Sequence, residues 1–120
     1  MAHPDLRIKR AYEPAAAEDG TRLLVDRLWP RGVSKEKLAA AAWLKEIAPS
    51  TGLRDWFGHK PEHAEGFRKR YTKELDANLE AVAEIRQWMK RGRVTLLHAA
   101  RDEVLNNAMV LRDYLLHAHS

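Results

Sequence analysis

The sequence V-D-R-L-W-P-R-G at residues Val25–Gly32 ends an apolar run that begins at Leu23. The side chains change there from aliphatic to charged and aromatic within a few positions, and Asp26 and Arg27 come first. Such a change is typical of a strand that is buried on both faces of a parallel sheet and ends at the rim of that sheet. We therefore predict a strand over Arg22–Leu28 whose carboxyl end presents polar groups.

A second apolar run has the same form. The run V-T-L-L at Val94–Leu97 leads into His98, and Arg101 and Asp102 follow. Because ligands of an open parallel sheet bind beyond the carboxyl ends of its strands, we expect the two strand ends to share one pocket. A guanidinium offers a planar fork that fits a phosphate or a carboxylate, so this pocket is predicted to bind an anion. The alternative is that Asp26 and Arg101 only form a structural ion pair across the sheet edge.

The other segments alternate strands with helices, which indicates an α/β fold with a mostly parallel sheet. The first strand is predicted at Arg7–Tyr12, and its short link to the second strand leaves a hairpin open as an alternative to a parallel pair. Ser34 is expected to cap a helix that begins at Lys35. A longer helix, or a short helix followed by a strand at Ala42–Ile47, fits the next residues equally well.

Apolar residues at steps of three and four predict amphipathic helices in the second half of the chain. One helix begins at Pro61, which suits a first helical position. The next is expected to be capped by Asn78 and to end at Gly92, and the last spans Asn106–His117. The predicted buried faces are Ala64, Phe67, Tyr71 and Leu75, then Val82, Ile85 and Met89, then Ala108, Leu111 and Leu115.

The composition is that of one soluble domain over residues 1–120, with 45% hydrophobic and 32% charged residues. A net charge of +4 favours anionic partners, although the 21 basic residues are spread along the chain. The chain has no cysteine, which excludes disulfides, thiolate nucleophiles and cysteine metal sites. No apolar run approaches the roughly 20 residues of a membrane span, and the N-terminus lacks the apolar core of a signal peptide. We expect a cytoplasmic protein without a membrane partner.

These residues support one hypothesis for the pocket. Arg27, Arg31 and Arg101 would hold the anion, which could be a nucleotide or a phosphorylated metabolite. Asp26 or His59 would move a proton, and Asp102 would orient a neighbouring group. The residues expected to line the pocket are Trp29, Ser50, Trp56, His98 and Asn106.

Two other classes of function remain open. Trp56 and Phe57 lie near basic residues and could stack on nucleic-acid bases, although such rings more often belong to a core. The rim could also dock a protein partner in a non-catalytic regulatory role. No metal or cofactor is predicted, because Pro61 interrupts the His59 and His63 pair and both glycine-rich nucleotide fingerprints are absent.

Several blocks of the chain, in the same order, resemble the YeaO-like proteins, a bacterial family of unknown function. They are Val25–Glu36, Trp43–Ser50, Leu53–His59, Phe67–Leu75 and Val94–Glu103, and the resemblance covers residues 7–116. It implies a small Rossmann-like α/β domain with three or four strands, a short strand near Trp43–Ile47, and Pro49 and Ser50 on the same rim as Asp26. In that family a Tyr is common at the position of His98 and a His at the position of Asn107. An amide does not titrate, so Asn107 cannot perform acid–base chemistry.

Overall fold

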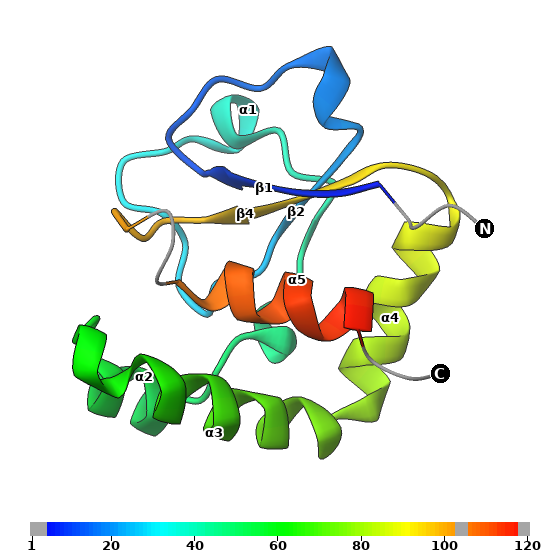
Figure 1. Ribbon diagram of the computed structural model, residues 1–120. Coiled ribbons are helices and arrows are strands. Elements are labelled where there is room, and N and C mark those ends of the chain that lie inside the picture. Colours follow the sequence, from blue (N-terminus) through cyan, green and yellow to red (C-terminus); the bar gives the residue numbers. More distant parts are fainter. Residues whose placement is uncertain (1–4, 103–105, 118–120) are drawn as a thin grey trace.

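The computed structural model describes residues 5–102 and 106–117. Its centre is a four-stranded sheet in the order β1-β4-β2-β3, and every strand pair is parallel (Figure 1). The strands are β1 (Leu6–Arg10), β2 (Thr21–Leu24), β3 (Ala42–Trp43) and β4 (Val94–His98). The predicted α/β class with a mostly parallel sheet is therefore confirmed.

The hairpin alternative for the first two strands is wrong. β1 and β2 do not pair with each other, because β4 lies between them and is parallel to both. Two strand spacings amount to only about 10 Å. The ten residues of the link 11–20, which include the short 3-10 helix η1 (Ala17–Asp19), are long enough to cross that distance.

β2 is shorter than the apolar pattern predicts, whereas β4 spans Val94–His98 as expected. β2 ends at Leu24 instead of Leu28, although the Val25 N–H still donates to the Leu97 carbonyl at 3.1 Å. The chain then turns away, because its neighbour β4 ends at His98 and offers no further partner for pairing. The polar residues that follow Val25 therefore lie at the rim of the sheet.

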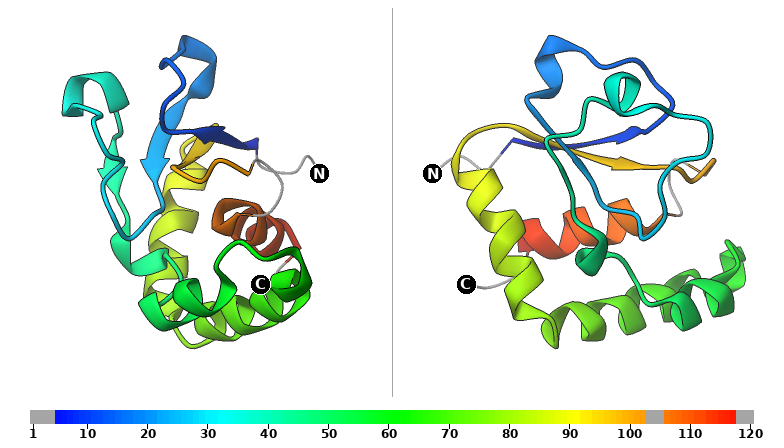
Figure 2. Two further views of the ribbon diagram at one scale, coloured as in Figure 1. Left: turned by 90° about the vertical axis from the view of Figure 1, so that its left-hand side faces the viewer. Right: turned by 180° about the vertical axis from the view of Figure 1, so that it is seen from behind.

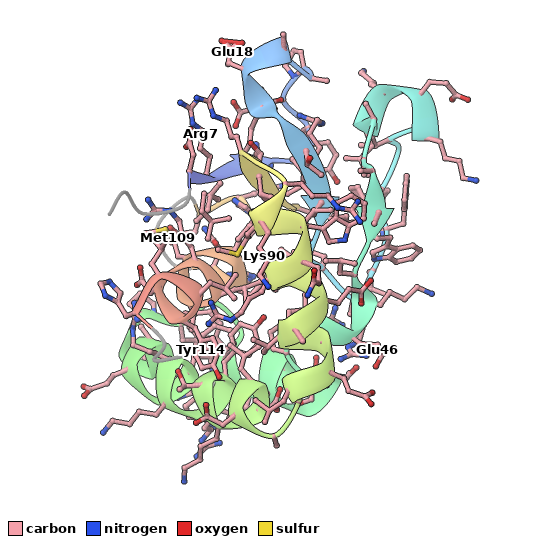
Figure 3. The ribbon with its side chains drawn as sticks, turned by 90° about the vertical axis from the view of Figure 1, so that its right-hand side faces the viewer. Arg7, Glu18, Glu46, Lys90, Met109 and Tyr114 are labelled. Carbon is pink, nitrogen blue, oxygen red and sulfur yellow. The ribbon has the colours of Figure 1, made fainter. Side chains whose placement is uncertain are left out.

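Four helices cover one face of the sheet (Figure 1). They are α2 (Thr51–Phe57), α3 (Ala64–Asp76), α4 (Leu79–Lys90) and α5 (Asn107–His117). Figure 1 shows α5 directly below the strands, with α2 and α3 as an outer layer. Tyr114 ties these layers together, since its hydroxyl donates to Asp76 of α3 at 2.8 Å (Figure 3). The predicted faces of the three long helices are buried with the single exception of Ala64, which is half-buried, so these predictions are confirmed.

The opposite face of the sheet carries a smaller core. The short helix α1 (Lys35–Leu38) and the segment before it pack there, as both views in Figure 2 show. Ser34 caps α1 as predicted, because its side chain accepts a hydrogen bond from the Lys37 N–H. Trp29 and Trp43 meet edge to face with ring centroids 5.3 Å apart and close this core at the rim.

The chain between β3 and α3 differs most from expectation. β3 ends at Trp43, and a 3-10 helix η2 (Lys45–Ile47) replaces the rest of the predicted strand. Residues 51–57 form the helix α2, which the sequence pattern does not predict, and the expected helix start at Pro61 is a 3-10 turn η3 (Pro61–His63). Among residues 5–102 and 106–117, no helix is both long and apolar enough to cross a membrane.

Asn78 does not cap α4 through its side chain. Its amide instead donates to the Glu46 carbonyl at 2.7 Å, which connects the start of α4 to η2. Gly92 follows the helix with a φ of 140°, as expected for a glycine at a helix end. Asn106 precedes α5 and caps it, because its side-chain oxygen accepts a hydrogen bond from the Met109 N–H at 2.8 Å.

Candidate functional site

A cleft of about 370 Å³ opens at the carboxyl end of the sheet. The left-hand view of Figure 2 looks onto this end of the molecule. The segment after β2, the end of α2, the segment after β4 and the start of α5 all contribute to it. Its polar lining comprises Asp26, Arg27, Arg31, Arg54, His59 and Asn107, and aromatic rings from Phe57 and Phe67 form part of the wall.

Asp26 is the acidic residue among the described residues of this lining. Its Oδ2 accepts a hydrogen bond from the Ala99 N–H at 2.8 Å, and its Oδ1 accepts one from the Asn107 amide at 3.2 Å. Burial raises the pKa of Asp26, while these two hydrogen bonds and the charge of Arg54 act in the opposite direction. The carboxylate therefore joins the ends of β2 and β4 to the start of α5.

Arg27 lines the cleft, and its guanidinium is held by two backbone carbonyls. Its Nη2 donates to the Ala48 carbonyl at 3.2 Å, and its Nε donates to the Pro49 carbonyl at 3.3 Å. Both acceptors are neutral carbonyls, so neither of them offsets the positive charge of the Arg27 guanidinium beside the cleft. The segment 48–50 therefore sets the orientation of this cation.

Two residues of α3 hold that segment in place. Glu74 accepts from Ser50 twice, from its backbone N–H at 2.8 Å and from its hydroxyl at 2.6 Å. The hydroxyl of Tyr71 donates to the Ile47 carbonyl at 2.6 Å. Burial raises the pKa of Tyr71 well above its ordinary value, so this hydroxyl stays a donor at neutral pH. The position of Arg27 thus depends on α3, which is far from it in sequence.

Arg31 and Arg54 differ from Arg27 because they are exposed. Neither guanidinium has a hydrogen-bond or ion-pair partner within the described residues. Sequence reasoning missed Arg54, because its place in the cleft depends on α2. The available signal was the Pro49-Ser50 pair, since Ser50 caps α2 through a hydrogen bond from the Leu53 N–H.

His59 lines the cleft on a loop, as expected for this residue. It follows Gly58, and both have left-handed backbone conformations, with φ of 52° for Gly58 and 56° for His59. The imidazole lies beside the ring of Phe57, with centroids 5.5 Å apart. Two successive left-handed residues turn the chain sharply after α2 and direct His59 to the cleft.

Four residues expected to line the pocket lie outside this cleft. Ser50 is engaged by Glu74 and α2, and Asn106 caps α5. Trp56 stacks on His63 at 4.2 Å between ring centroids. His98 is buried in the sheet, because the alternation of a strand turns it to the same face as Val94 and Leu96.

The remaining predicted residues lie at the rim. Trp29 lines the cleft and donates its indole N–H to the Val33 carbonyl at 2.6 Å. Arg101 and Asp102 are exposed and outside the cleft lining. Within the described residues no ion pair joins Asp26 to Arg101. The Asp102 carbonyl accepts from the Asn106 side chain at 2.9 Å, and residues 103–105 lie outside the described part of the chain.

His98 combines deep burial with an unsatisfied ring nitrogen. Its Nδ1 is buried and has no hydrogen-bond partner in the part of the chain that the structure describes. Burial, aided by the charge of Arg10, lowers the pKa of His98 to about 4. The imidazole is therefore neutral at physiological pH and behaves as a core residue. Across residues 5–102 and 106–117, no cluster of three histidine or acidic side chains could hold a metal ion.

Comparisons with known proteins support the family. The family model DUF488-N3i, described as "Inactive DUF488-N3 subclade", matches residues 5–120. The uncharacterised protein YeaO of Escherichia coli (strain K12) is 41% identical over 111 residues, which cover 92% of this chain and 96% of YeaO. The uncharacterised protein Rv3073c of Mycobacterium tuberculosis (strain ATCC 25618 / H37Rv) is 40% identical over 110 residues, which cover 92% of each chain. No solved structure matches the chain.

Proposed function

The chain belongs to the DUF488-N3i family, and we propose that its cleft binds an anionic small molecule, such as a nucleotide or a phosphorylated metabolite, without turning it over. The observation that carries this proposal is the charge of the lining. Arg27, Arg31 and Arg54 stand against Asp26 as the acidic residue there. Two of the three guanidiniums are free of protein acceptors within the described residues, so their donors are available to a ligand.

The size of the cleft supports a small ligand. A volume of about 370 Å³ falls in the range of small-molecule sites, which is roughly 300–1,000 Å³. Buried Phe57 and Phe67 contribute apolar wall, and Tyr12 and Leu28 are exposed at its lining. Apolar walls with a few convergent polar groups are typical of binding sites. A cytoplasmic location, as expected from the sequence, would expose the cleft to phosphorylated metabolites.

Two observations favour binding over catalysis. The matching family model is described as inactive. The amide of Asn107 stands in the cleft and donates to both Asp26 and the Val25 carbonyl, and an amide neither gives nor takes a proton at neutral pH. The proton transfer hypothesised for Asp26 and His59 is therefore not part of the proposal.

Thermal shift against a panel of nucleotides and phosphorylated metabolites tests the proposal. The variant Arg31→Ala/Arg54→Ala removes two exposed cations from the cleft, and Lys37→Ala/Lys90→Ala removes the same charge from exposed positions outside it. A ligand at 100 times its dissociation constant stabilises the folded state by about 2.7 kcal/mol. We expect this stabilisation in the wild type and the lysine variant and its loss in the arginine variant. If no anion stabilises the wild type more than the arginine variant, the proposal is refuted.

A further inference from the structure

Asp26 has unused acceptor capacity in the cleft. A carboxylate offers about four lone-pair sites, and the structure shows one hydrogen bond to each oxygen of Asp26. Both donors are neutral, one a backbone N–H and the other an amide. No ion pair of Asp26 lies within the described residues. The carboxylate of Asp26 therefore has acceptor sites that a ligand can use.

A bound ligand changes the hydration of the Asp26 carboxylate and the charges around it. It displaces water, and a buried charge that loses water without gaining a donor is costly. An anionic group placed next to Asp26 would also be repelled by it. The arginines carry the opposite charge, and Arg31 and Arg54 are exposed cations on the same cleft. The favourable ligand is therefore one that separates an anionic group from a hydrogen-bond donor.

We infer that the cleft recognises a phosphate ester that also carries hydroxyl groups, with its phosphate on Arg31 and Arg54 and a hydroxyl donating to Asp26. This inference rests on the proposed function and specifies the ligand class for the same site. A phosphate monoester carries about two negative charges at neutral pH. Among the described residues of the lining, three arginines against one aspartate leave a matching excess of positive charge. Sugar phosphates, and the ribose phosphate part of nucleotides, have this chemistry.

Calorimetric titration with two matched ligands tests the inference. Ribose 5-phosphate and tetrahydrofurfuryl phosphate share a five-membered ring and a phosphate, and only the first has ring hydroxyls. A hydrogen bond to a charged acceptor predicts that the wild type binds ribose 5-phosphate about tenfold more tightly, or better. In Asp26→Asn, the preference should fall below about threefold. The affinity for tetrahydrofurfuryl phosphate should stay equal or rise in that variant, because a negative charge has gone.

Asp55→Asn is the matched control. Asp55 is exposed on α2, next to Arg54 in sequence and outside the cleft lining. The substitution Asp55→Asn removes the same charge as Asp26→Asn, and the preference for the ligand with hydroxyls should persist in this variant.

A wild type that binds both ligands with equal affinity overturns the inference and leaves the proposed function intact. A preference that survives in Asp26→Asn also overturns it. If neither ligand binds the wild type, the inference fails, and the thermal-shift panel of anions decides the proposed function separately. The wild-type comparison needs no folded variant.

Discussion

The link between Glu74 and Ser50 yields a quantitative prediction. The two residues lie 24 positions apart, and Glu74 accepts both the backbone N–H and the hydroxyl of Ser50. Through segment 48–50, this contact also fixes the carbonyls that hold Arg27. Removing either partner should therefore destabilise the fold, and removing both should cost less than the two single changes added together.

The magnitudes follow from the number of hydrogen bonds lost. A hydrogen bond to a charged group is worth about 1.5–3 kcal/mol, and the half-buried position of Glu74 favours the lower end. Glu74→Ala loses two such bonds, so its free energy of unfolding should fall by about 3 kcal/mol. Ser50→Ala loses one of them and the cap of α2, so we expect a fall of about 2.5 kcal/mol. The hydroxyl bond is lost in both variants, which predicts a coupling energy of about 1.5 kcal/mol.

Urea denaturation of the wild type, both single variants and the double variant measures this coupling. Glu84→Ala on α4 is the control, since its exposed carboxylate lies outside this contact and its loss should change stability by less than about 0.5 kcal/mol. Additive effects of Glu74→Ala and Ser50→Ala would refute the reasoning. They would mean that α3 does not hold the segment beneath Arg27.

Three further predictions concern the stability of the fold. The pKa of His98 is lowered from 6.5, its value in the unfolded chain, to about 4 in the folded protein. The stability that the neutral imidazole contributes is therefore complete above pH 6.5 and is lost as the pH falls towards 4. In pH-dependent denaturation, the free energy of unfolding of the wild type should fall by roughly 3 kcal/mol more over that range than that of His98→Gln. Gly20→Ala places a Cβ 2.5 Å from the Arg93 carbonyl oxygen at a φ of 66°, and should lower stability by roughly 1–3 kcal/mol in a thermal melt; a melt like that of the wild type would contradict the close approach. Tyr71→Phe leaves the Ile47 carbonyl without its donor and should cost about 1–3 kcal/mol in urea, whereas an unchanged midpoint would show that this hydrogen bond contributes nothing.

The sequence predicts the sheet well because burial leaves a direct pattern in it. The apolar runs at Leu23–Val25 and Val94–Leu97 identify the central strands, and their polar continuations mark the rim. The order of the strands cannot be predicted from such a pattern, because no local feature of the sequence indicates that β4 lies between β1 and β2. That choice depends on packing between segments far apart in the chain.

The candidate site likewise contains some residues that the sequence predicts and others that it does not. Asp26, Arg27 and Arg31 directly follow a strand that the sequence identifies, and they line the cleft. Arg54 depends on α2, whose seven residues include Gly52 and carry only a weak helical pattern. His98 follows a strand like Asp26, yet strand alternation turns it into the core. Position at a strand end predicts the rim, whereas the direction of a side chain requires the neighbouring elements. The binding roles of the lining residues stay predictions.

Amide and arginine side-chain chemical shifts, followed by NMR while phosphate or ribose 5-phosphate is added, test the central claim most directly. The cleft predicts saturable shifts at the Ala99 amide, at Asn107, and at the Nε–H groups of Arg27, Arg31 and Arg54. The exposed lysines Lys69 and Lys73 of α3, which lie outside the cleft lining, should not respond. Shifts confined to α3, or none at the cleft at saturating anion, would contradict an anion site at the carboxyl end of the sheet.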